Sequence, residues 1–132
     1  MKNFYIESTE YSPRINIDFQ QQKFELTGVS RPENVIAFYE SIILKLDRFI
    51  DETIERGAID DINFSLKFDL RYMNSGSSKY IMIILDRFRK LLDKNAKIKI
   101  DWYYNDLDDQ ILEDGEILSE VIRVPFNLIQ RN

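Results

Sequence analysis

The strongest constraint on the fold is a long alternation of apolar and polar residues in the middle of the chain. From Ile62 to Tyr72 every second side chain is apolar, and those between are polar or charged. This pattern predicts a strand with one buried and one wet face, because successive side chains of a strand point to opposite faces. Ile98–Tyr104 begins with the same alternation. Strands covered on both faces would be apolar throughout. We therefore predict an α/β fold with one mixed sheet and helices packed mainly on one face.

A helix is predicted before the central strand. Ser30 as the cap, Pro32 in the first turn and Glu33 three residues after the serine fit a capping box. Gly57 is a suitable stop. Between them, apolar side chains recur at helical spacing: Val35, Phe38, Tyr39, Ile42, Ile43, Leu46, Phe49 and Ile50.

A second helix is predicted after the central strand, from about Ser77 to Lys94. Its core stripe consists of Ile81, Ile84, Leu85, Phe88 and Leu92. Each of the two helices lies between two predicted strands, which is the order of a right-handed parallel crossover.

The remaining segments complete the predicted sheet. Ile15–Phe19 and Phe24–Leu26 predict a hairpin. Asp106–Leu118 is acidic and predicts a short helix, and Val121–Ile129 predicts a last strand. Pro125 favours an edge position for that strand, because proline cannot donate to the hydrogen-bond ladder. With 132 residues, the chain is expected to form a single domain over 1–132.

Composition narrows the function classes. The chain has no cysteine and no histidine, which removes thiolate chemistry and the commonest general base and metal ligand. A net charge of -5 argues against a nucleic-acid partner or an anionic membrane. No apolar signal segment follows Met1, and no apolar run is long enough to insert into a membrane. We expect a cytoplasmic regulatory protein with no catalytic residue, metal or cofactor.

The hydroxyl-rich segment Asn74–Lys79 is the first candidate site. It is predicted to link the central strand to the second helix, at the carboxyl end of a strand, where ligands bind in open α/β sheets. A helix N-terminus stabilises added negative charge, so a phosphorylated serine would be favoured there. The alternative is that asparagine, serine and glycine only build a turn and cap the helix. The segment lacks the spacing of a P-loop.

Two further groups of residues are candidate partner surfaces. Tyr80, Met82 and Ile83 are apolar positions beside or opposite the core stripe of the second helix. They either bind a partner or are covered by the edge of the sheet or by the first helix. Asp106, Asp108 and Asp109 lie in the acidic segment, which either begins a helix, docks a basic partner, or binds Mg²⁺ or Ca²⁺ together with Glu113.

Three blocks, in this order along the chain, resemble the SiaC-type bacterial phosphoproteins, regulators of biofilm formation and cyclic-di-GMP signalling. The first is Ser12–Phe19 followed by Leu26–Glu33 and Ala37–Tyr39, the second is Tyr72–Lys79, and the third is Trp102–Asp109. The resemblance implies a fold similar to STAS domains, the anti-sigma-factor antagonists. It also implies partner switching: a serine kinase similar to anti-sigma-factor kinases and a PP2C-type phosphatase act on the protein. The unphosphorylated form then binds and activates a diguanylate cyclase.

The resemblance implies Ser77 as the phosphoacceptor, because it occupies the fourth position of an Asn-Ser-Ser-Thr pattern. Two residues depart from that pattern: Gly76 stands for serine and Ser77 for threonine. Ser75 and Ser78 are the alternative acceptors. Asn74 and Ser75 are expected to shape the loop, and Lys79 to help neutralise the phosphate. We expect the Ser77 hydroxyl to project into solvent.

Two alternative functions remain at this point. One is an antagonist of an anti-sigma factor, within the same STAS-like class. The other is a metal-binding protein or enzyme that uses Asp106, Asp108, Asp109 and Glu113, which requires these carboxylates to converge around an open coordination position.

Overall fold

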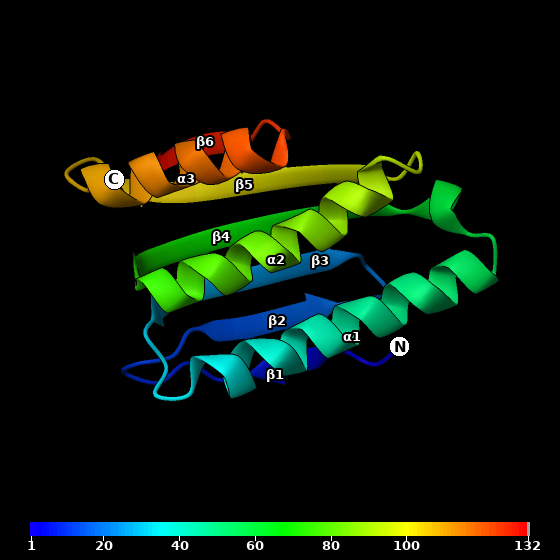
Figure 1. Ribbon diagram of the computed structural model, residues 1–132, viewed down its shortest axis with the longest axis horizontal. Coiled ribbons are helices and arrows are strands. Elements are labelled where there is room, and N and C mark those ends of the chain that lie inside the picture. The colour runs from blue at the N-terminus through cyan, green and yellow to red at the C-terminus, as the bar shows by residue number, and fades with distance from the viewer. Residues whose placement is uncertain (132) are drawn as a thin grey trace.

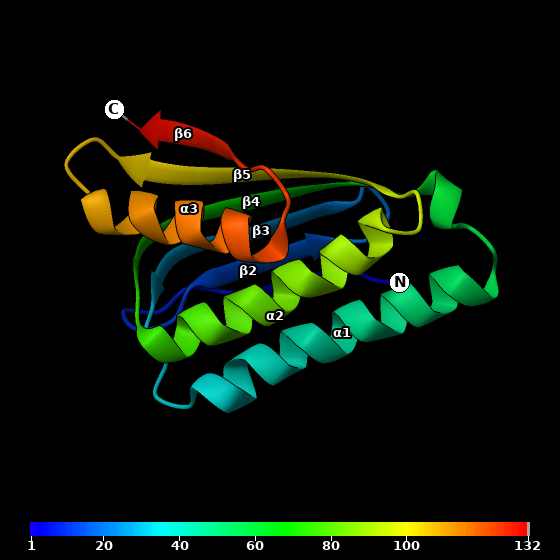
Figure 2. The same cartoon turned by 45° about the horizontal axis from the view of Figure 1, so that its top comes forward.

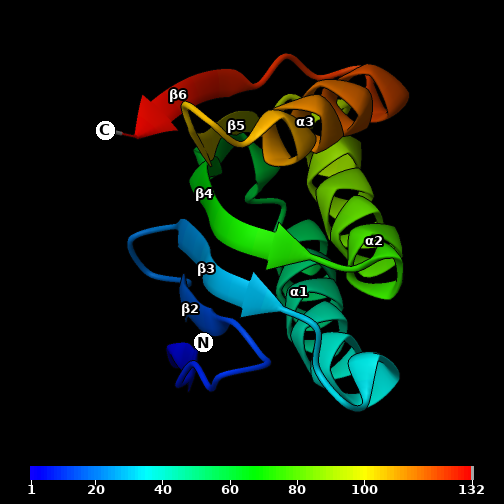
Figure 3. The ribbon, with the colours of Figure 1, turned by 90° about the vertical axis from the view of Figure 1, so that its left-hand side faces the viewer.

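A single sheet with helices on one face forms the architecture of the computed structural model, which describes residues 1–131 (Figure 1). The strands are β1 (Phe4–Ile6), β2 (Arg14–Asp18), β3 (Lys23–Ser30), β4 (Asn63–Met73), β5 (Lys97–Asn105) and β6 (Asn127–Arg131). They lie side by side in chain order. The helices are α1 (Val35–Glu55), α2 (Ser75–Leu92), α3 (Asp109–Ile122) and the short 3-10 helix η1 (Ile59–Asp61). Figures 2 and 3 show α1, α2 and α3 on the same side of the sheet, which confirms the predicted fold class.

Strand pairing confirms the predicted hairpin of β2 and β3 and the two parallel crossovers through α1 and α2. β1, β2 and β3 pair antiparallel, and β3, β4, β5 and β6 pair parallel. Three strand–helix–strand crossovers therefore follow one another in the described residues. The three long helices all begin at the carboxyl edge of the parallel strands (Figure 1). This arrangement brings the predicted phosphorylation segment and the acidic segment to the same edge of the sheet.

Of the two sheet faces, one carries the hydrophobic core. β4 contributes Phe64, Leu66, Phe68 and Leu70, each at most 2% exposed, and Trp102 of β5 stacks on Phe68 with ring centroids 5.6 Å apart. The other face of β4 is polar, as the alternation predicted. Across it, Arg131 of β6 forms an ion pair with Asp69 of β4. This pair joins two strands that are separated by β5.

A β-bulge near the end of β4 contradicts the predicted position of Tyr72. Gly28 pairs with Leu70 and Val29 pairs with Tyr72, so Arg71 has no partner in β3. The extra residue reverses the alternation, because each step along a strand turns the side chain to the other face. Tyr72 is therefore 50% exposed, and Met73 occupies the core position at 8% exposed.

The predicted capping box at Ser30 is wrong. Ser30 is the last residue of β3, where it pairs with Met73, and its side chain is fully buried. The cap of α1 is Asn34, whose side-chain oxygen accepts a hydrogen bond of 3.0 Å from the Ala37 amide. Pairing with the extended β4 strand holds Ser30 in the sheet, so the helix starts at the next suitable cap.

Two predicted boundaries near the C-terminus are also corrected. Val121 and Ile122 belong to α3, not to the last strand. The helix continues past Leu118 because Ile122 extends the buried stripe by one more turn, and it ends where Arg123 adopts a left-handed conformation. Pro125 lies in the connection, and β6 begins at Asn127. β6 is nevertheless an edge strand, as predicted.

None of the helices described in residues 1–131 is long and apolar enough to span a membrane.

Gly115 allows α3 to approach the sheet. A methyl group at this position would lie 2.5 Å from the Trp102 indole, which also donates a hydrogen bond of 2.8 Å to the Ile111 carbonyl. We expect Gly115→Ala to lower the free energy of unfolding by about 1–3 kcal/mol, because the indole is buried and has little room to move. Denaturant unfolding measures this. Glu116→Ala at the exposed neighbouring position is the control, and equal stability of the two variants would contradict this packing.

Candidate functional site

Residues Asn74–Ser78 form the beginning of α2 and not a separate turn. Asn74 is the cap, and its side-chain oxygen accepts a hydrogen bond of 2.8 Å from the Ser77 amide. The Asn74 carbonyl accepts a bond of 3.0 Å from the Ser78 amide. The helix thus starts two residues earlier than predicted, and the capping alternative for Asn74 is confirmed.

The expectation that the Ser77 hydroxyl projects into solvent is wrong. Ser77 is 0% exposed. Its hydroxyl donates a hydrogen bond of 3.0 Å to the Ser30 carbonyl and accepts one of 2.8 Å from the Ser30 hydroxyl. Ser77 is the third residue of α2, and its side chain faces inward because this position lies next to Ser30, the last residue of β3. Ser75 and Lys79 are exposed, while Gly76 and Ser78 are partly exposed.

A third hydroxyl completes a buried cluster, which we call the hydroxyl cluster: Ser30, Tyr39 and Ser77. The phenol of Tyr39, from α1, is hydrogen-bonded to the Ser30 hydroxyl. Since the Ser30 proton points to Ser77, Tyr39 donates. Burial raises the pKa of Tyr39 to about 12, against a smaller lowering by the neighbouring Ser30 and Ser77 side chains. The phenol therefore stays protonated near neutral pH, as a donor must.

Ser30 and Tyr39 are site residues that the sequence analysis missed. They lie 47 and 38 residues before Ser77 in the chain, and no motif connects them. In β3, Ser30 lies on the same face as the buried residues Phe24 and Leu26. A polar residue at a position expected to be buried was therefore the one sequence signal that could have indicated Ser30. A buried tyrosine hydroxyl also usually needs a partner.

The α2 surface residues Tyr80, Met82 and Ile83 are all partly exposed. The ring of Tyr80 stacks on Tyr39 at 5.8 Å between centroids, with an interplanar angle of 6°. Met82 packs partly against the core. Ile83 lies one turn after Tyr80 and one turn before Arg87, which forms an ion pair of 2.8 Å with Asp47 of α1. Tyr80 and Ile83 thus lie along the side of α2 that faces α1.

Acidic residues of the β5–α3 connection reach the same edge of the sheet as the start of α2 (Figure 1). Asp108 caps α3, because its carboxylate accepts a hydrogen bond of 3.1 Å from the Ile111 amide. Asp106 and Asp109 are exposed. Within residues 1–131, no three His, Cys, Asp or Glu side chains are grouped closely enough to hold a metal ion. The convergence that a metal site at Asp106, Asp108, Asp109 and Glu113 requires is therefore not present.

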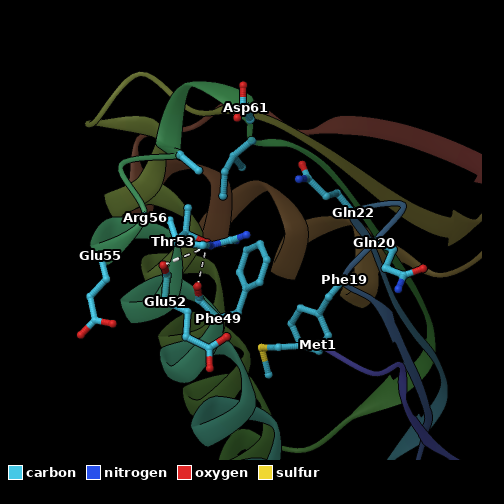
Figure 4. A pocket seen from close by; sticks show the side chains of 12 residues that line it. Met1, Phe19, Gln20, Gln22, Phe49, Glu52, Thr53, Glu55, Arg56 and Asp61 are labelled. Carbon is cyan, nitrogen blue, oxygen red and sulfur yellow. Dashed lines mark hydrogen bonds between the residues drawn. The ribbon is translucent and has the colours of Figure 1, made fainter.

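A cavity of about 510 Å³ has none of the hydroxyl-cluster residues in its wall (Figure 4). It is bounded by the last turns of α1 and by the β2–β3 turn, with Phe19, Gln22, Phe49 and Arg56 in its wall. Thr53 there donates its hydroxyl to the Phe49 carbonyl. The arrangement supplies no evident reactive group.

These features define the class of protein: a small α/β domain whose candidate site is a hydroxyl cluster at a strand–helix junction. The family model for SiaC family regulatory phosphoproteins matches residues 6–131, so the chain belongs to the SiaC family. An uncharacterized protein from Pseudomonas aeruginosa strain UCBPP-PA14 is 27% identical over 128 residues, covering 96% of this chain and 94% of that protein.

Solved structures from Pseudomonas aeruginosa agree with this assignment. A chain in the crystal structure of the diguanylate cyclase SiaD in complex with its activator SiaC is 25% identical, with a TM-score of 0.83. The match covers 97% of this chain and 99% of that one. The crystal structure of apo-SiaC matches with a TM-score of 0.80 at 24% identity, over 100% of both chains. The predicted family resemblance is confirmed.

The raised pKa of Tyr39 makes stability depend on alkaline pH. An unfolded tyrosine ionises near its ordinary pKa of 10.0, whereas the folded one holds its proton up to about 12. Its contribution is therefore complete below pH 10 and is lost as the pH rises toward 12. We expect the wild type to lose about 2–3 kcal/mol more than Tyr39→Phe between these limits. Denaturant unfolding at several pH values measures this, and parallel pH profiles would contradict it.

Proposed function

We propose that this protein is a phosphorylation-controlled regulator of a diguanylate cyclase, which it binds and activates when unphosphorylated. Membership of the SiaC family supports this proposal, together with the likeness to SiaC, the activator in the SiaD complex. The protein acts by binding and not by catalysis, in the cytoplasm. A serine kinase and a PP2C-type phosphatase set its phosphorylation state.

Ser77 is the proposed phosphoacceptor. The observation that carries the proposal is its inward position at the start of α2. A phosphate on this hydroxyl would meet the Ser30 carbonyl, now 3.0 Å from the Ser77 oxygen, at a position that is closed to bulk solvent. A dianion beside a carbonyl oxygen is strongly unfavourable in such surroundings. Phosphorylated Ser77 therefore cannot occupy the position seen here, and the start of α2 must rearrange.

The exposed neighbours are poorer switches. A phosphate on Ser75 would extend into water at a helix N-terminus, where negative charge is stabilised. It would change the surface charge but leave the hydroxyl cluster intact. Ser78 is partly exposed, so its burial is intermediate between that of Ser75 and that of Ser77.

The proposed cyclase-binding residues are the α2 surface residues Tyr80, Met82 and Ile83, together with Asp106, Asp108 and Asp109 at the same edge of the sheet as the start of α2 (Figure 1). Tyr80 connects this surface to the switch, because it follows Ser77 by three residues and stacks on Tyr39. Rearrangement of the first turn of α2 would thus disturb the beginning of the binding surface. Lys79 is exposed between them and is available to an added phosphate.

The acceptor is tested with the cognate kinase and ATP. We expect the wild type to gain one phosphate, mapped to Ser77 by mass spectrometry, and Ser77→Ala to gain none. Ser75→Ala and Ser78→Ala are matched controls that should still be phosphorylated at Ser77. Phosphate on Ser75 or Ser78 of the Ser77→Ala protein would show that the acceptor is elsewhere.

Binding to the cyclase is expected to weaken at least tenfold in Ser77→Asp, since a buried carboxylate next to the Ser30 carbonyl opens the same turn. Ile83→Asp should weaken binding without affecting phosphorylation, because it changes only the surface. Calorimetry with the purified cyclase measures both. Ile54→Asp is the control, as Ile54 is 45% exposed near the far end of α1. A pull-down in which this protein binds an anti-sigma factor, and not a cyclase, would favour the alternative function as an anti-sigma-factor antagonist.

A further inference from the structure

Any kinase that modifies Ser77 must first reach a hydroxyl that is 0% exposed. We propose that the first turn of α2, residues 75–78, opens locally, and that Ser30 and Tyr39 act as positioning residues that set how often it opens. The rate of phosphorylation then follows the open fraction of the protein. This inference rests on the proposed role of Ser77 as acceptor.

The contacts that hold the turn closed are few and identifiable. Ser30 supplies them through two atoms: its carbonyl accepts from the Asn74 amide at 3.0 Å and from the Ser77 hydroxyl at 3.0 Å. Its hydroxyl donates to Ser77 at 2.8 Å. Tyr39 orients that hydroxyl by donating to it from the other side. Each of these bonds to Ser77 breaks when the turn opens.

Opening can remain local because α2 is firmly held from its second turn onward. Ile81, Ile84 and Leu85 are all 0% exposed, and Tyr80 is stacked on Tyr39. Residues 75–78 contribute no apolar side chain to the core. Short segments with few buried apolar contacts open at a lower free energy than the whole domain.

Gly76 gives the turn a built-in tendency to open. Glycine gains more backbone freedom on unfolding than alanine does. A methyl group at Gly76 would meet Val35 at 3.6–3.7 Å, an ordinary contact distance, and the residue has no positive φ. Gly76→Ala is therefore compatible with the closed turn and should stabilise it. We therefore expect Ser30→Ala to favour the open form of residues 75–78 and Gly76→Ala to favour the closed form.

Hydrogen exchange measures the opening without the kinase. The reporters are the Ser77 and Ser78 amides, which donate to the Asn74 side chain and carbonyl. The amides of Ile84 and Leu85 report global unfolding. Relative to those, we expect the reporter amides to exchange about two- to tenfold faster in Ser30→Ala and in Tyr39→Phe, the effect of losing one hydrogen bond. They should exchange about two- to fivefold more slowly in Gly76→Ala.

A matched control separates the phenol hydrogen bond from the aromatic packing. Tyr80→Phe removes a neighbouring phenol hydroxyl but keeps the ring that stacks on Tyr39. It should leave the exchange of the reporter amides unchanged. The double variant Ser30→Ala with Tyr39→Phe should open no more than twofold beyond Ser30→Ala, because Tyr39 acts through Ser30.

Kinase assays complete the test. Initial phosphorylation rates at subsaturating protein should rise in Ser30→Ala and Tyr39→Phe and fall in Gly76→Ala, in proportion to the exchange data. Unchanged exchange of the Ser77 and Ser78 amides in all three variants would overturn the inference, as would exchange that changes while phosphorylation of Ser77 does not. Failure of the proposed acceptor is distinguished by the Ser77→Ala protein, which would then still be phosphorylated.

Discussion

The carbonyl group of Ser30 is the contact on which the arrangement of the site depends. It ends β3 and accepts hydrogen bonds from the Asn74 amide and the Ser77 hydroxyl, each at 3.0 Å. This backbone oxygen thereby joins the end of β3 to the start of α2, the helix that follows β4. The bulge at Arg71 makes this geometry available, because it turns Met73 into the core and leaves Asn74 at the cap position. Tyr39 ties α1 to the same point.

Burial reverses the usual effect of a phosphate at a helix N-terminus. On the solvent side of a first turn, added negative charge gains from the helix dipole and from unpaired amides. At Ser77 the side chain lies on the inner side, where its hydroxyl donates to a carbonyl oxygen and is not exposed to solvent. The cost of desolvating a dianion exceeds the dipole gain of about 1 kcal/mol. The same modification would therefore stabilise the helix start at Ser75 and disrupt it at Ser77.

Periodicity predicted the sheet and its one-sided packing, because burial repeats every second residue of β4 and every third or fourth residue of the helices. The order of strands and helices along the chain then predicted the two parallel crossovers next to β4. Periodicity failed where one extra residue shifted the register, as at Arg71 and Tyr72, and where strand pairing retained Ser30 in the sheet. Residues 74–79 join β4 to α2, as predicted, but the direction of the Ser77 side chain was predicted wrongly. That direction depends on a contact with Ser30, 47 residues away in the chain, which local patterns do not encode.

Tyr39 has two neighbours that belong to different parts of the proposed switch. Its hydroxyl contacts Ser30 in the hydroxyl cluster, while its ring stacks on Tyr80 of the α2 surface. A change at Ser77 therefore needs to travel less than two turns of α2 to reach the proposed binding residues. The proposed switch requires no domain movement, because Tyr39 contacts both Ser30, which is bonded to Ser77, and Tyr80 of the proposed surface. In the proposed switch, a local rearrangement of the first turn of α2 connects the Ser77 hydroxyl to the proposed binding residues.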